Sequence, residues 1–211
     1  MKTLVIHPAD ATTTFLTEIY VDKNWTVINH NPSHKELKAQ IAAHDRIVML
    51  GHGTEYGLIQ PNNGLRLIIN SDLVYLLRQK ICICIWCNAD IFARKYELKG
   101  FYTGMIISEY TEAIDFAVNT TADELLYSNI WFAKCVKDSI DAPNMLSKMK
   151  LKYDHDTNPV IDFNKKILYQ SLYCDLAKLC RRINEINKII LFIEFKILAE
   201  FVQITASLRK T

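Results

Sequence analysis

The sequence predicts an α/β fold in which a mostly parallel central sheet is sandwiched between helices. Short apolar runs alternate with helical patterns over residues 1–110. Continuous apolar strands separated by helices are typical of a parallel sheet that is covered on both faces. In addition, 50% of the 211 residues are hydrophobic, which is enough apolar material for a sizeable core.

Five strands are expected in this part of the chain, each a run of apolar or β-branched residues bounded by polar or turn-forming residues. They cover residues 3–7, 25–29, 46–50, 81–86 and 102–107. A β-hairpin is expected directly after the third strand, because Asn63-Gly64 lies between two apolar runs and Asn-Gly favours a tight hairpin turn.

Helices are expected between these strands and after them. Pro32-Ser33 begins one, and Ser71-Asp72 and Asn88 are suitable N-caps for two others. The segment 121–140 has acidic residues early and lysines late, which suits the helix dipole. The expected helices cover residues 13–20, 34–44, a short segment ending near 78, 89–98, 121–140 and 143–151.

The C-terminal region has a pattern of its own, and we divide the chain into an α/β domain over residues 1–160 and a helical extension over 161–211. From Tyr169 to Ile197, apolar residues recur in alternating steps of three and four, which is a heptad seam. One interpretation is a long helix packed on its own domain or in a helical bundle. The other is a homo-oligomer formed through residues 168–204.

Composition argues against several classes of partner. Lys plus Arg number 25 and Asp plus Glu number 23, so the balance of +2 predicts no nucleic-acid or membrane surface. The N-terminal apolar run is too short for a signal peptide, and no run of about 18 apolar residues predicts a membrane span. With six cysteines and no secretion signal, reduced thiols in the cytoplasm are expected.

Two residues with the chemistry of a nucleophilic enzyme follow neighbouring strands. The third strand runs into Gly51-His52-Gly53, and the fourth runs into Cys87. Residues just past the carboxyl ends of neighbouring parallel strands share one crevice, so His52 and Cys87 are expected to face each other. An imidazole raises the thiolate fraction of a neighbouring cysteine, and it later protonates the leaving amine.

These residues resemble a known motif. RIVMLGHG followed by ICICIWCNAD is similar to the paired strands of the caspase-like cysteine peptidases of clan CD, which include the gingipains and the CHAT-type proteases. The resemblance covers residues 44–110 and implies a caspase-hemoglobinase fold. It implies His52 as general base and acid, Cys87 as nucleophile, and the backbone amides of Gly53 and Cys87 as the oxyanion hole. The implied substrate is a protein or peptide.

The chain departs from this family at the nucleophile. Trp86 precedes Cys87, Asn88-Ala89 follows it, and the next glycine is Gly100. An alternative function is therefore a catalytically inactive scaffold that acts as an interaction module through its C-terminal helix. A third is a flavodoxin-like or nucleotide-binding domain that uses the same crevice.

Glu109, just beyond the fifth strand, is a candidate substrate-binding residue for a basic side chain, with a solvated loop carboxylate as the alternative. Cys82, Cys84 and Cys87 form C-x-C-x-x-C, but no second ligand pair accompanies them, so no metal site is expected. No cofactor is expected either.

Overall fold

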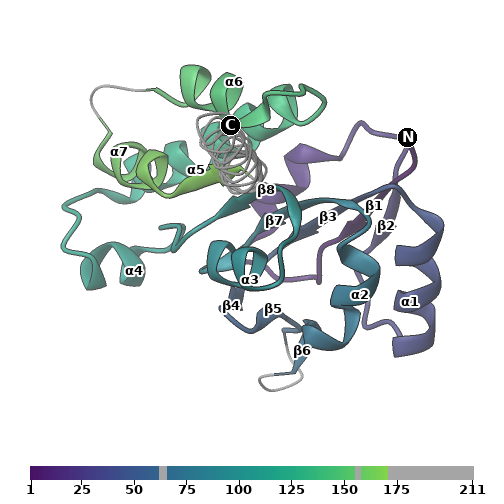
Figure 1. Ribbon diagram of the computed structural model, residues 1–211. Coiled ribbons are helices and arrows are strands. Elements are labelled where there is room, and N and C mark those ends of the chain that lie inside the picture. Colours follow the sequence, from purple (N-terminus) through teal and green to yellow (C-terminus); the bar gives the residue numbers. More distant parts are fainter. Residues whose placement is uncertain (62–65, 155–157, 171–211) are drawn as a thin grey trace, which may run out of the picture. The chain divides into compact units, whose positions relative to one another are not determined.

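The computed structural model describes residues 1–61, 66–154 and 158–170 (Figure 1). Its main feature is a six-stranded sheet in the order β2-β1-β3-β7-β8-β9, in which β1 pairs with β2 and β3, and β7 with β3 and β8, all in parallel. The last strand, β9, runs antiparallel to β8. The strands are β1 (Thr3–Ile6), β2 (Thr26–Ile28), β3 (Arg46–Leu50), β7 (Ile81–Ile85), β8 (Lys99–Thr103) and β9 (Leu168–Gln170). The predicted α/β class with a mostly parallel central sheet is therefore confirmed.

A small antiparallel sheet follows β3, as the Asn-Gly signal predicts. It has the order β4-β5-β6, with strands β4 (Gly53–Thr54), β5 (Gly57–Ile59) and β6 (Leu67–Ile69). The hairpin of β5 and β6 is confirmed, although its tip at 62–65 lies outside the described residues. The two-residue strand β4 is an addition that the sequence did not reveal.

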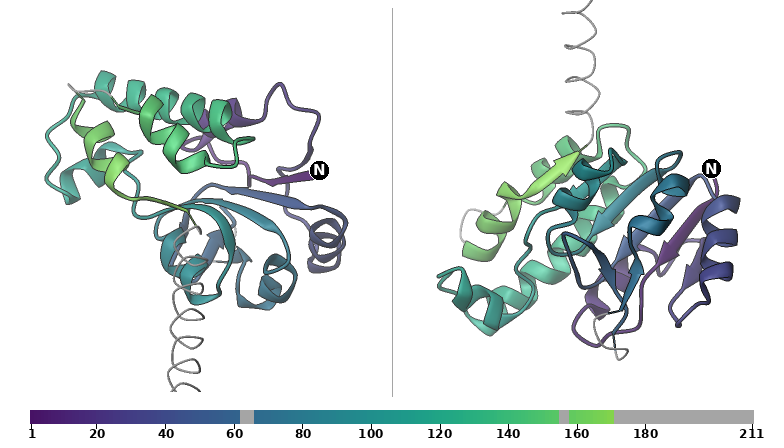
Figure 2. Two further views of the ribbon diagram at one scale, coloured as in Figure 1. Left: turned by 45° about the horizontal axis from the view of Figure 1, so that its top comes forward. Right: turned by 60° about the horizontal axis from the view of Figure 1, so that its bottom comes forward.

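Helices cover both faces of the main sheet (Figures 1 and 2). One face carries α1 (His34–Ala43), α2 (Val74–Leu77) and α3 (Ala89–Lys95), and the other carries η1 (Thr14–Ile19), α5 (Ala122–Ser139) and α6 (Met145–Lys152). The remaining elements are η2 (Ser71–Leu73), α4 (Tyr110–Asp115) and α7 (Pro159–Lys166). Within the described residues, no helix is long and apolar enough to cross a membrane.

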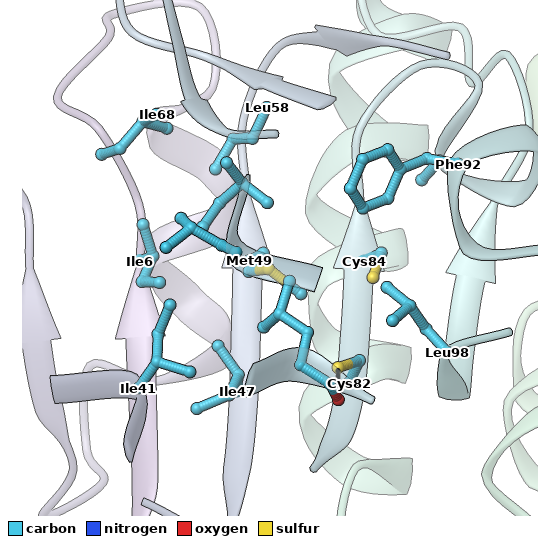
Figure 3. Close-up of a cluster of buried hydrophobic side chains, with 14 of the residues drawn as sticks. Ile6, Ile41, Ile47, Met49, Leu58, Ile68, Cys82, Cys84, Phe92 and Leu98 are labelled. Atoms are coloured by element: carbon cyan, nitrogen blue, oxygen red, sulfur yellow. Dashed lines mark hydrogen bonds between the residues drawn. The ribbon is translucent and has the colours of Figure 1, made fainter. Parts of the chain in front are cut away.

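The strand pleat divides the core into two layers. In β3, Ile47 and Met49 pack under α1 to α3, whereas Val48 and Leu50 pack under η1, α5 and α6. Figure 3 shows the first layer, where the Ile47, Met49 and Cys84 side chains lie together on one side of the sheet. Because successive side chains of a strand point to opposite faces, a run of five buried residues requires helices on both sides.

Two predicted elements are shifted. The fifth strand covers 99–103 and not 102–107, because the parallel ladder pairs Lys99 with Ile81 and Gly100 with Cys82. Gly100 has φ +134°, and an added Cβ there would overlap the Cys82 carbonyl oxygen. The second residue of β8 must therefore be glycine. The segment predicted as a helix over 13–20 is a 3₁₀ helix over Thr14–Ile19.

The C-terminal boundary also differs from the expectation. Residues 161–170 do not form the start of one long helix: α7 ends at Lys166, and β9 then pairs with β8. Leu168 is 1% exposed and belongs to the core, so strand pairing and burial outweigh the heptad pattern at this point. The first unit of the chain ends at Ser171 and not at residue 160. The rest of the predicted oligomerisation segment lies outside the described residues.

Candidate functional site

His52 and Cys87 lie at the same edge of the main sheet. Leu50 and Ile85 are register partners at the ends of β3 and β7. His52 lies two positions after Leu50, and Cys87 lies two positions after Ile85. The Gly51 amide donates to the Ile85 carbonyl (3.1 Å), which continues the alignment past the ladder. Neighbouring parallel strands are about 4.8 Å apart, so the backbones of His52 and Cys87 emerge side by side.

Packing between Gly53 and Trp86 holds the two segments together. An added Cβ at Gly53 would overlap the Trp86 ring, and the Trp86 indole N–H donates to the Thr54 carbonyl (3.0 Å). Trp86 is 1% exposed. Since Gly53 follows His52 and Trp86 precedes Cys87, this contact fixes both candidate residues.

The turn from β7 into α3 is tight and carries Cys87 at its apex. Asn88 is the N-cap residue of α3, as predicted, but it adopts the left-handed conformation (φ 64°) and its side chain makes no capping hydrogen bond. The Asn88 amide donates to the Gly104 carbonyl (3.1 Å) and the Ala89 amide to the Trp86 carbonyl (3.2 Å). Thr103 Oγ1 also donates to the Trp86 carbonyl (2.9 Å). The backbone on both sides of Cys87 is therefore anchored.

The Cys87 thiol is half-buried and faces carboxylates. Its Sγ lies 3.7 Å from the Ile106 carbonyl oxygen and 3.8 Å from Glu112 Oε1. Burial raises the pKa of the Cys87 thiol to about 12, and the carboxylates of Glu112 and Glu109 act in the same direction. The thiol in this arrangement is protonated at neutral pH.

Glu112 has two roles at this position. Its Oε2 accepts from the amides of Ser108 (2.7 Å) and Glu109 (3.0 Å), which completes the capping box of α4. Its Oε1 is left to face Cys87 Sγ. The helix cap thus brings a negative charge to the thiol, and the sequence pattern, which pointed only to Glu109, gave no sign of it.

Two side chains approach the same nitrogen of the His52 ring. Its Nε2 lies 2.6 Å from Thr12 Oγ1 and 3.5 Å from Glu109 Oε1. The His52 and Glu109 side chains are 29% and 36% exposed, so this edge is open to solvent. Among the described residues, no hydrogen bond joins the His52 ring to Cys87 Sγ. Glu109 is the carboxylate that both groups share.

The geometry of the predicted oxyanion hole differs between its two amides. Ile59 N–H donates to the His52 carbonyl (2.8 Å). Because hydrogen bonding alternates along an antiparallel pair, the Gly53 amide points away from β5. The Cys87 amide lies in the turn before α3, directly before the amides of Asn88 and Ala89, which both donate to backbone carbonyls.

A cavity of about 730 Å³ opens beside this edge, at the carboxyl ends of β1 and β2. Its lining includes His7, Asp10, Tyr20 and Asn29. The His7 ring bonds Tyr20 Oη (2.9 Å) and Thr13 Oγ1 (3.2 Å), and burial lowers the pKa of His7 to about 4, so the ring is neutral. The strand order reverses between β1 and β3, where ligands of open α/β sheets bind, whereas this cavity lies on the other side of β1, toward β2.

In the part of the chain that the structure describes, no three His, Cys, Asp or Glu side chains gather as metal ligands. No protein-family model matches the sequence, and a search of the curated proteins finds no match.

Proposed function

We propose that this chain is a cysteine endopeptidase with a His52–Cys87 dyad that acts by covalent acyl transfer. The observation that carries the proposal is the placement of the two residues at equal distances past paired strand ends, with one carboxylate near both. The glycine at 53, required by the Trp86 ring, leaves an amide beside His52 without a side chain to obstruct it.

The reaction would follow the chemistry of these groups. The thiol proton passes to His52 as the sulfur bonds to the peptide carbonyl carbon, and the Gly53 and Cys87 amides stabilise the oxyanion. His52 then gives the proton to the leaving amine as the C–N bond breaks. Water hydrolyses the thioester, releasing the acid and restoring the thiol.

The substrate that suits this edge carries a basic side chain close to the cleaved bond. Glu109 and Glu112 oppose ionisation of the Cys87 thiol. A lysine or arginine side chain beside them offsets their charge and so favours the thiolate. In this proposal Glu109 is the substrate-binding residue, and an empty site keeps its nucleophile protonated.

The test is labelling with a peptide acyloxymethyl ketone that carries arginine next to the reactive group. We expect an adduct on Cys87 that is lost in His52→Ala and slower with an aspartate analogue of the probe. Tryptic peptide 81–94 contains Cys82, Cys84 and Cys87, so fragment spectra must assign the adduct. Equal labelling of Cys87 in wild type and His52→Ala defeats the dyad.

The second candidate is a non-enzymatic interaction module, and the carboxylates that face the Cys87 thiol favour it. In this case Cys87→Ala changes no property of the protein, and the heptad region mediates assembly. Its test is a chain that ends at residue 171, which keeps β9 in the sheet. An unchanged number of subunits per particle by light scattering, after allowance for the smaller subunit, contradicts the second candidate.

A further inference from the structure

The segment that follows β1 provides side-chain contacts to His52 that are not part of the motif. Thr12 Oγ1 lies 2.6 Å from His52 Nε2. The Thr12 amide and hydroxyl both approach the same oxygen of Asp10, Oδ1, at 2.8 Å and 2.7 Å. Asp10, Thr12 and His52 thus form a continuous chain of hydrogen bonds across 40 residues of sequence.

The direction of these bonds follows from the donors available. An ionised carboxylate only accepts, so the single Thr12 hydroxyl proton is donated to Asp10. The hydrogen bond from the Thr12 side chain lowers the pKa of Asp10 below its usual value, with a smaller contribution in the same direction from His52. Since the hydroxyl proton is used, Thr12 Oγ1 must accept from His52, and the imidazole proton is on Nε2.

Glu109 favours the same proton position. Its Oε1 lies 3.5 Å from His52 Nε2 and, as a carboxylate, it too can only accept. Both neighbours of the ring therefore require a proton on Nε2, which leaves Nδ1 as the unprotonated nitrogen.

We propose that Thr12 and Asp10 are positioning residues that hold the His52 ring with its proton on Nε2 and present Nδ1 as the base. The hydrogen bonds of the His52 ring are independent of the proposed function, whereas the catalytic role of the ring rests on it. An oriented imidazole with a fixed tautomer is the form that general-base catalysis needs, because the wrong tautomer has no lone pair to accept the thiol proton.

The first experiment is proton–nitrogen NMR on the full chain with ¹⁵N-labelled histidine, using His52→Ala to assign the ring. We expect a His52 Nε2–H resonance that exchanges slowly with water, although the ring is partly exposed. This resonance disappears in Thr12→Val and weakens in Asp10→Asn, whereas Thr12→Ser keeps it. Thr14→Val is the matched control, because the Thr14 hydroxyl bonds the Asp10 backbone carbonyl (3.0 Å) and makes no bond to His52.

The second experiment measures inactivation by the arginine ketone probe in the same variants. We expect Thr12→Val to slow it by about tenfold or more, with Thr12→Ser and Thr14→Val close to wild type. A proton on Nδ1 in the wild type overturns the proposal, as does an Nε2–H resonance that persists in Thr12→Val. If the resonance behaves as expected but Cys87 is never labelled, the positioning role stands and the peptidase function fails.

Discussion

At the scale of single residues, the candidate site places a thiol and an imidazole at one edge of the sheet, and burial and the nearby carboxylates keep the thiol protonated. The Cys87 thiol is half-buried and faces Glu112, while His52 is bound to Thr12 at the same edge. Ionisation of the Cys87 thiol depends on the charges beside it, which makes the carboxylate at position 112 the most informative one to change.

Glu112→Gln should increase the reactivity of Cys87. Removing this charge lowers the pKa of the thiol, and the thiolate fraction at pH 8 rises about tenfold for each unit by which that pKa falls. The measurement is the rate of iodoacetamide labelling of Cys87, followed by mass spectrometry. Glu124→Gln is the matched control, because Glu124 fills the same capping-box position in α5 (Figure 1). Equal rates in the two variants would show that the Glu112 charge does not restrain the thiol.

His7 predicts a stability that depends on pH. Its pKa is about 4 in the folded chain and about 6.5 when unfolded, so the unfolded state binds the proton first as pH falls. The contribution of His7 to the free energy of unfolding is fully present above pH 6.5 and is lost as pH falls to about 4. The loss amounts to about 3 kcal/mol. Urea unfolding of wild type and His7→Asn between pH 7 and 4 measures it, and parallel curves for the two proteins would refute the assignment.

At the scale of helices and strands, local signals predicted most elements. Apolar runs bounded by turn residues located β1, β3 and β7, and the Asn-Gly hairpin was found where expected. The errors arise where pairing with a strand distant in sequence determines where an element begins or which type it is. The ladder to β7 starts β8 at Lys99, and pairing with β8 makes a strand of Leu168–Gln170 inside a heptad pattern.

The helix α5 offers a test of a predicted element. Thr121 Oγ1 accepts from the Glu124 amide (3.2 Å), and Glu124 Oε2 accepts from the Thr121 amide (2.8 Å). Thr121→Ala should lower the free energy of unfolding by about 1 kcal/mol, and Thr121→Ser should retain it. Urea denaturation checks this, and an alanine variant as stable as wild type would show that the cap contributes nothing.

At the scale of the whole molecule, the order of the strands was enough to predict that His52 and Cys87 lie at one edge of the sheet, but most of the side chains around them were missed. Topology alone brings His52 and Cys87 to one edge of the sheet. Thr12 and Asp10 could not be found in advance, because the polar segment after β1 has no periodic pattern and its partner is 40 residues away. Glu112 was missed for a related reason, since its capping role is local and its contact with Cys87 is not.

Assembly is a prediction for the complete chain. The heptad seam from Tyr169 onwards predicts self-association, although Leu168–Gln170 belongs to the sheet. Sedimentation of the full chain should therefore give a mass above 24.4 kDa, and the chain ending at residue 171 should sediment as a monomer. A monomeric full chain at micromolar concentration would leave the seam as an intramolecular packing surface.

The contact between Gly53 and Trp86 has a consequence for variation in this protein. Because the indole occupies the space that a side chain at position 53 would need, the two positions cannot change independently. A combinatorial library randomised at both should return a residue larger than glycine at 53 only with a smaller ring or an aliphatic residue at 86. Each such exchange alters the spacing between the segments that carry His52 and Cys87.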